Sequence, residues 1–338
     1  MQDDDRDTAE AEAPLSAAVA VLGADPGFSL ARLLRRGGLA IADAEPAPKQ
    51  ASEALACRFH FGLASARAGT LGEVRRIADL LAQARSLVMP ESGFWPQPDG
   101  SFVDGWRPEV DGAGLPDLAK ARAFRRAHLG AVAQVLTTSD TLVLPLLHVT
   151  ARRDPATGSV FAEPPPGVAH PDPPRHRAEA ADLDAAFARL HAEAQAAHPG
   201  LRLHLVVPPA RPEDPAETRS ARDLLAAQAA LWARSFAGVR HDPVFDALLG
   251  RAAALPADHP ELDALASVLA RLGAGADLLE IVAGSAAPLA APAPDAGRQR
   301  RQKDPERRAK RKAKAEAKGK GAAAKVMCED ELLEAFSK

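Results

Sequence analysis

Only a few residues in this sequence have both the type and the setting that chemistry requires. A serine hydroxyl becomes a nucleophile when a base such as histidine takes its proton. Ser29 stands at the start of an expected helix, Ser65 follows later in the chain, and His148 lies in a long apolar segment. Each has a commoner structural role, because first-turn serines and hydrogen-bonded histidines in buried strands are frequent. These residues alone therefore do not indicate catalysis.

The sequence gives little support to metal or redox chemistry. His170, Asp172 and His176 share a proline-rich loop, but their spacing matches no known set of metal ligands. Cys57 and Cys328 are the only cysteines, and two such distant residues indicate neither a metal site nor a disulfide framework. We therefore expect no metal, no cofactor, and free thiols in a reducing compartment.

One charged pair belongs to a loop that also holds two tryptophans. Asp104 and Arg107 are three residues apart, and Trp95 and Trp106 are close to them in the chain. A charge-assisted hydrogen bond between the carboxylate and the guanidinium would hold this loop in shape. The alternative is that the pair binds a substrate, and we favour the structural role.

Apolar patterning predicts the elements that must position these residues. Short apolar runs predict strands at 17–22, 39–42, 141–149 and 201–207. Apolar residues at a spacing of three and four predict helices at 28–36, 70–84, 118–136, 178–197, 219–236 and 262–272. Strands that alternate with helices predict a mostly parallel sheet with helices on both faces, which is a three-layer α/β/α sandwich.

Charge divides the 338-residue chain into an acidic body and a basic tail. Residues 298–325 contain 13 Lys/Arg and 3 Asp/Glu, although the net charge of the whole chain is only −3. We expect a disordered acidic N-terminus at 1–15, one domain at 16–285, an Ala/Pro linker at 286–297, the basic and partly helical segment at 298–325, and a short amphipathic helix at 326–338.

The tail is the part of the sequence most suited to a partner. A basic segment on an acidic body can reach an acidic partner, so we expect 298–338 to contact an unidentified protein or an anionic surface. The basic segment has no aromatic residue to stack on bases, and the case for nucleic acid is not strong. The acidic N-terminus is unlike a secretory signal, no apolar run is long enough for a membrane span, and a cytoplasmic protein is expected.

Five short segments occur in the order and at the spacing of one bacterial family. They read Gly-Ala-Asp-Pro-Gly at 23–27, Ser-Ala-Arg-Ala-Gly-Thr at 65–70, Asp-Gly-Trp-Arg-Pro at 104–108, Pro-Leu-Leu-His-Val-Thr-Ala-Arg at 145–152 and Val-Pro-Pro-Ala at 207–210. The ending at 328–336 also looks like that of some members. Over roughly residues 17–275 the chain therefore resembles the GSCFA-domain family, which is similar to the SGNH-type esterases. The resemblance implies an SGNH-hydrolase-like domain.

The chain departs from this family at positions where an esterase needs polar groups. The position of the family's serine nucleophile is Ala24, and the position of its asparagine is Thr70. A methyl group cannot attack an ester. A glycine, a threonine and a glutamate of the family correspond to Leu147, Val149 and Thr150, and a serine corresponds to Val207. The resemblance would place around one pocket Gly23, Ala24, Asp25, Gly69, Thr70, Leu147, Val149, Thr150 and Val207.

These departures predict a degenerate, non-catalytic domain that acts in binding or scaffolding. The alternative is an active ester hydrolase or acyl transferase, acting on esters of a carbohydrate or small molecule, whose nucleophile has been displaced. The candidates for its site are Ser29, His148 and His259. His259 lies where SGNH-type enzymes carry their catalytic histidine, although the usual aspartate three residues earlier is Pro256 here.

Overall fold

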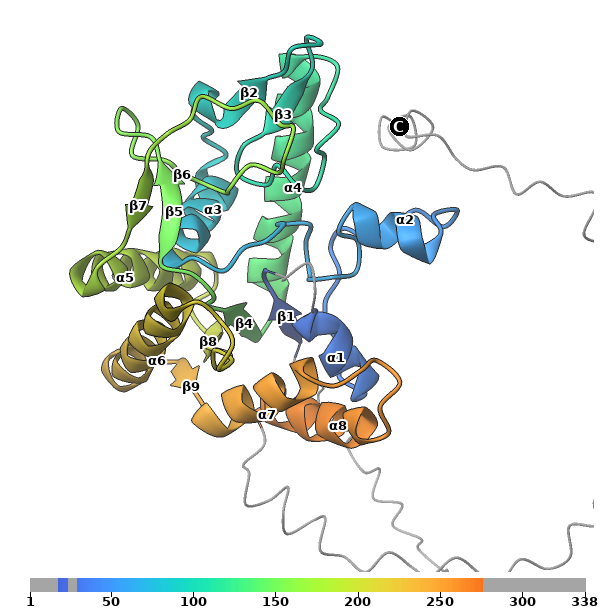
Figure 1. The fold of residues 1–338 in the computed structure, drawn as a ribbon, viewed down its shortest axis with the longest axis vertical. Coiled ribbons are helices and arrows are strands. Elements are labelled where there is room, and N and C mark those ends of the chain that lie inside the picture. The colour runs from blue at the N-terminus through green and yellow to red at the C-terminus, as the bar shows by residue number, and fades with distance from the viewer. Residues whose placement is uncertain (1–17, 24–28, 276–338) are drawn as a thin grey trace, which may run out of the picture. The chain divides into compact units, whose positions relative to one another are not determined.

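The computed structural model describes residues 18–23 and 29–275, and a parallel sheet lies at its centre (Figure 1). The strands are β1 (Val19–Val21), β4 (Thr141–Pro145), β8 (Arg202–Val206) and β9 (Val239–His241), in the order β1-β4-β8-β9. Ile41 adds one parallel bridge to Val19 on the other side of β1. Apart from Pro48–Ala51, the described residues belong to one compact unit.

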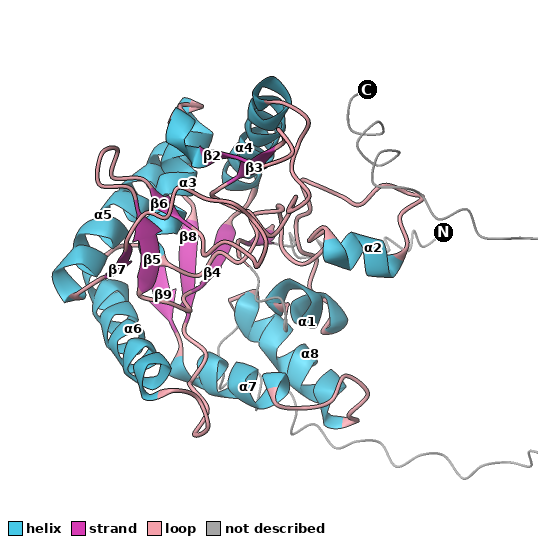
Figure 2. Cartoon of the chain, turned by 45° about the horizontal axis from the view of Figure 1, so that its top comes forward, coloured by secondary structure: helices cyan, strands magenta, loops and turns pink. Residues whose placement is uncertain are grey.

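Helices cover both faces of the sheet because the side chains of each strand alternate between two apolar cores. Ala20, Leu142 and Leu203 belong to one core, together with α3 (Val74–Ser86), α4 (Leu118–Thr138), α5 (Ala180–Ala197) and α6 (Ala216–Ser235). Val19 and Val143 belong to the other core, together with α1 (Leu30–Arg36), α7 (Pro243–Ala253) and α8 (Glu261–Gly273). Figure 2 shows α5 and α6 on one side of the sheet and α1 and α8 on the other. The predicted three-layer α/β/α fold is confirmed.

Side chains that cap the helices fix where several of them begin. Ser29 caps α1 and accepts a hydrogen bond from the backbone N–H of Arg32, and Glu73 caps α3 in the same way. Asp242 caps α7, whose first residue is Pro243. Such caps satisfy backbone donors that have no partner inside the helix. The predicted helix at 70–84 therefore begins only after Glu73.

Two small antiparallel sheets lie outside the central one. A hairpin pairs β2 (Phe94–Pro96) with β3 (Phe102–Asp104). The second sheet has the order β6-β5-β7 and consists of β6 (Val160–Phe161), β5 (Thr150–Arg153) and β7 (Arg175–Arg177). The chain also forms α2 (Glu53–Arg58) and a short 3-10 helix, η1 (Glu91–Gly93). None of these elements was predicted.

All four predicted strands are shorter in the structure, and those at 17–22 and 201–207 are reduced to Val19–Val21 and Arg202–Val206. The run at 141–149 leaves the central sheet after Pro145, because the backbone N–H groups of Leu147 and His148 donate to the carbonyl of Gly72 instead of to a strand. The run at 39–42 is reduced to the single bridge at Ile41. The end of the apolar run does not mark the end of the strand here, because the apolar residues after β4 are buried in a loop.

Several predictions concern residues that lie outside the described ranges. They are the N-terminal segment at 1–15, Ala24 and Asp25, the linker at 286–297, the basic segment at 298–325 and the final helix at 326–338. Within the described residues, no helix combines the length and apolar character needed to cross a membrane.

Candidate ligand-binding cavity

The carboxyl ends of the central strands meet where the order of the sheet reverses. From β1 the chain continues to Ile41 on one side, whereas β4 pairs with β1 on the other. Loops diverge at such a reversal and leave a crevice, which is where parallel α/β sheets bind their ligands. Gly23 stands at the end of β1 with φ +95°, and a Cβ at this position would clash with the carbonyl of Leu71. Gly23 therefore permits the close approach of these two loops.

A cavity of about 480 Å³ lies beyond the end of β4, between the first turn of α3, the sheet of β5, β6 and β7, and the start of α6, and we call it the polar cavity. Charged and hydroxyl side chains from segments that are distant in the sequence contribute to its wall. It is lined by Thr70, Glu73, Arg76, Glu109, Leu147, His148, Val149, Thr150, Ala151, Phe161, Ala162, Glu163, Pro165, Arg175, Arg177, Glu217, Thr218 and Ala221. Its size is in the range of small-molecule sites.

The structure brings several of the predicted pocket residues together in this cavity. Thr70, Leu147, Val149 and Thr150 all line it. The other described members do not line it: Gly23 lines a second cavity, Gly69 precedes Thr70, and Val207 is buried in the core at the end of β8.

The second cavity, of about 570 Å³, lies beside the first and has a wall of prolines. Pro145, Pro208 and Pro209 contribute to it. Leu147 and Thr218 line both cavities. The side chain of Leu147 therefore stands at the boundary between the two cavities.

The two candidate serines hold the backbone in place. The hydroxyl of Ser29 donates to the carbonyl of Leu63 (2.6 Å) and accepts from the N–H of Arg32 (3.2 Å). The buried hydroxyl of Ser65 accepts from the N–H of Val21 (2.9 Å). Neither serine lines the polar cavity. Both therefore have structural roles in this arrangement.

The two candidate histidines lie far apart in the fold. His148 is exposed and lines the polar cavity, so the expectation that it is a core histidine in a strand is wrong. Because β4 ends at Pro145, His148 lies outside the central sheet. His259 lies in the loop before α8, where its Nδ1 accepts from the N–H of Glu261 (3.3 Å). That loop contacts the C-terminal end of α1 through Arg36, whereas Ser29 is at the other end of α1.

Arg76 is the most deeply buried cation of the polar cavity. It lies in the first turn of α3, and its guanidinium donates to the carbonyls of Thr70 (2.7 Å) and Trp106 (2.8 Å). Burial lowers its pKa from the ordinary value of arginine, but an arginine remains charged. The cavity therefore has a fixed positive charge in its wall.

Two carboxylates in the cavity wall are held by backbone N–H groups. Glu73 accepts from the N–H of Arg76 (3.0 Å) and from Nε of Arg75 (2.6 Å), and burial raises its pKa. Glu109 accepts from the N–H of Thr70. Gly69 has φ +71°, and a Cβ there would clash with the Glu109 carboxylate. Gly69 thus leaves the room that this carboxylate occupies.

The charges on the outer wall are paired with each other. Glu163 accepts from Arg175 (2.9 Å) and from Arg152 (3.1 Å). Arg177 lies 3.5 Å from Glu217. These ion pairs join β5, β7 and α6 around the opening. They are partly exposed, so each adds little stability by itself.

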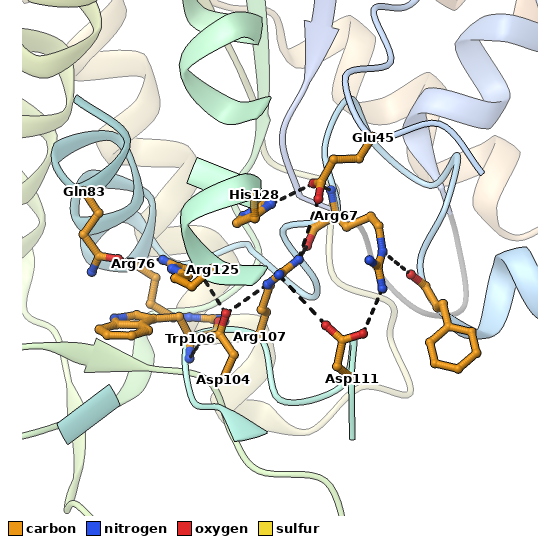
Figure 3. Close-up of polar contacts among 11 residues, drawn as sticks. Glu45, Arg67, Arg76, Gln83, Asp104, Trp106, Arg107, Asp111, Arg125 and His128 are labelled. Carbon is orange, nitrogen blue, oxygen red and sulfur yellow. Dashed lines mark hydrogen bonds and ion pairs between the residues drawn. The ribbon is translucent and has the colours of Figure 1, made fainter. Parts of the chain in front are cut away.

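A network of buried charges supports the loop that carries Glu109 (Figure 3). The predicted ion pair is present, because Nε of Arg107 donates to Oδ2 of Asp104 (3.0 Å). Arg125 reaches the same oxygen (3.5 Å) and lies over the ring of Trp106, 4.7 Å from its centre. Arg67 donates to Asp111 (3.1 Å). Within the described residues Asp104 and Arg107 belong to this network and do not line the polar cavity.

His128 closes the network at α4. Its Nδ1 lies 2.7 Å from Oε2 of Glu45, and because a carboxylate only accepts, the ring nitrogen donates. Burial lowers the pKa of His128 to about 4, with the charge of Arg107 acting in the same direction. His128 is therefore neutral at pH 7. Burial likewise lowers the pKa of Arg125 to about 10.

Sequence reasoning missed the charged residues of the cavity. Glu73 and Arg76 lie in the predicted helix at 70–84, Glu109 directly follows the predicted Trp loop, and Glu163 and Arg175 lie beside proline clusters. The available signal was weak, because arginine at the start of a helix is ordinary. Only the tertiary arrangement places these five residues around one space.

In the described part of the chain, no group of three or more histidine, cysteine, aspartate or glutamate side chains is arranged to hold a metal ion. His170 and Asp172 contact each other in their loop, with the N–H of Asp172 donating to Nδ1 of His170 (3.0 Å). His176 instead contacts Arg75 (2.6 Å). The three residues therefore do not gather around one point.

Comparison of the chain with protein-family models, with curated proteins and with solved structures finds no significant match.

Proposed function

We propose that this protein binds a small molecule in the polar cavity, on a fold like that of an SGNH-type esterase but without its chemistry. The observation that carries the proposal is a cavity beyond the end of β4 whose wall includes Thr70, Leu147, Val149 and Thr150. These are four of the positions at which the sequence departs from the GSCFA-domain family that it resembles. On that resemblance, the substitutions would remove polar groups of an esterase site, while the cavity is still present.

The residues around the cavity support binding more than catalysis. An ester hydrolase needs a nucleophile beside a base and donors aimed at the oxyanion. His148 could act as a base from the cavity wall, but the hydroxyls of Ser29 and Ser65 are bonded to the backbone elsewhere. An active esterase or acyl transferase on carbohydrate or small-molecule esters is the alternative function. It requires a nucleophile other than these two serines.

The proposal predicts that filling the polar cavity abolishes binding. Thr150 lies at the start of β5 and is only partly buried, so Thr150→Trp adds bulk to the cavity with little damage to the core. Thr137→Trp makes the same change at an exposed position near the end of α4. Thermal denaturation with a set of amino acids, sugars, nucleotides and carboxylic acids should reveal a ligand that raises Tm for the wild type and for Thr137→Trp. A ligand stabilises the folded state by mass action.

Two results would count against the proposal. One is that no compound of the set raises the Tm of the wild type. The other is that Thr150→Trp, shown by circular dichroism to be folded, still responds to the same compound at the same concentration.

Residues 298–338 are proposed to contact an anionic partner or surface in a cytoplasmic setting, on the basis of charge alone. Retention of the full chain on a heparin column should fall steeply with salt, and deletion of 298–338 should remove it. Unchanged retention after the deletion would rule out this role.

A further inference from the structure

The polar cavity contains two opposite charges that are not paired with each other. The guanidinium of Arg76 donates only to the backbone carbonyls of Thr70 and Trp106, and Glu109 accepts from the N–H of Thr70. Neither side chain forms an ion pair with any other residue that the structure describes. Both line the polar cavity.

This pair differs from the other charges in the wall. Glu73 is paired with Arg75, Glu163 with Arg175, and Glu217 with Arg177. A buried guanidinium without a carboxylate partner is costly, because desolvation is not repaid by attraction to an opposite charge. Glu109 is the carboxylate whose charge acts most strongly on Arg76. The two groups are thus electrostatic neighbours that do not touch.

The composition of the wall argues against a ligand with charge of one sign. An anion that met Arg76 would also meet Glu73 and Glu109, and a cation that met Glu109 would also meet Arg76 and Arg175. A ligand that carries both a negative and a positive group can place the negative one against Arg76 and the positive one against Glu109. The apolar part of such a ligand would lie against Leu147, Val149 and Phe161, which are buried members of the same wall.

We propose that the polar cavity binds a small zwitterion, of the class of α-amino acids with an apolar side chain. The ligand carboxylate pairs with Arg76, and the ligand ammonium group pairs with Glu109. A guanidinium is well suited to a carboxylate because it can donate two parallel hydrogen bonds. This inference rests on the proposed function of the same cavity and names its ligand.

Four related probes separate the two charges of the ligand. L-leucine carries both, N-acetyl-L-leucine lacks the ammonium group, L-leucinamide lacks the carboxylate, and N-acetyl-L-leucinamide lacks both. Titration calorimetry of the full chain at pH 7 should detect binding of L-leucine. Loss of either charge should weaken binding at least about 30-fold, because it leaves Arg76 or Glu109 without its partner inside the cavity.

Two variants assign the ligand charges to residues. In Arg76→Gln, L-leucine and L-leucinamide should bind with similar affinity, and in Glu109→Gln, L-leucine and N-acetyl-L-leucine should do so. Comparison of two ligands on one variant isolates the interaction from any general loss of stability. Arg85→Gln is the matched control, because Arg85 lies on the same helix in an exposed pair with Glu193. It should retain the wild-type preference.

The outcomes separate this inference from the function on which it rests. If N-acetyl-L-leucinamide binds as tightly as L-leucine, or if none of the four probes binds the wild type, the zwitterion is overturned. The cavity remains a binding site if another class of compound still raises Tm in wild type and not in Thr150→Trp. If no class does so, the proposed function is overturned as well.

Discussion

At the scale of single residues, His128 shows how burial makes the fold sensitive to acid. Its ring is fully buried in α4 beside Glu45, and one ring nitrogen has no hydrogen-bond partner among the described residues. Because the pKa is lowered to about 4 in the folded chain, the ring stays neutral there while the unfolded chain takes up a proton below about pH 6.5. Acid therefore favours unfolding.

The sign and size of this effect can be predicted. The unfolded state binds more protons between about pH 6.5 and 4, so the free energy of unfolding decreases as pH falls through this window. The loss from His128 is about 3 kcal/mol, taken from the two pKa values at about 1.4 kcal/mol per unit. His204 contributes with the same sign, because burial lowers its pKa to about 3.

Urea unfolding at several pH values tests this prediction. His128→Asn should be less stable than wild type at pH 7, since the bond to Glu45 changes, but its stability should decrease less between pH 6.5 and 4.5. The residual slope belongs to His204 and other groups. Equal slopes in the two proteins would mean that His128 titrates normally in the folded state.

Asp104 lies at the centre of the same network, and its pKa is lowered, whereas burial alone would raise the pKa of a carboxyl group. Burial opposes its ionisation, but the guanidiniums of Arg125 and Arg107 outweigh it and hold its pKa below the ordinary value. The pair with Arg107 could be predicted from two residues three apart in the chain. The wider network could not, because its members come from segments between Glu45 and His128 that only the fold brings together.

At the scale of elements, Ser29 illustrates a residue whose chemistry is structural. Its hydroxyl caps α1 and bonds to Leu63, which lies in a loop distant in sequence. Ser29→Ala should therefore destabilise the protein by about 1 kcal/mol, the usual cost of losing a cap. Ligand binding in the polar cavity should be unchanged, as measured by the Tm shift.

The control for this prediction is Ser29→Thr, which keeps a hydroxyl that can both donate and accept. It should be closer to wild type in chemical denaturation. A large loss of binding or of any esterase activity in Ser29→Ala, with stability unaffected, would show that Ser29 belongs to the functional site.

The elements differ in how well the sequence predicts them. Long helices such as α4 and α5 were predicted nearly to their ends, because apolar periodicity over many residues is a strong signal. Strands of two or three residues, such as β6 and β9, are too short to show a period. The helix α7 was missed although Asp242 followed by Pro243 is a favourable start.

At the scale of the whole molecule, the fold places the second cavity at the carboxyl ends of the central strands and the polar cavity next to it, beyond the end of β4. The strand order, and hence the reversal at β1, could be anticipated only as a general α/β arrangement. Four residues of the predicted pocket do line the polar cavity. Its charged wall was not predicted, because Arg76 comes from the first turn of a helix and Arg175 from a strand without apolar patterning.

The proposal that the domain binds a ligand without catalysis requires that the protein has no reactive serine, and labelling with a fluorophosphonate probe tests this most directly. The full chain and an active serine hydrolase would be treated in parallel and followed by intact-mass analysis and peptide mapping. We predict no adduct on this chain under conditions that label the hydrolase completely. A stoichiometric adduct on one serine, Ser29 or any other, would contradict the claim and identify the protein as an enzyme.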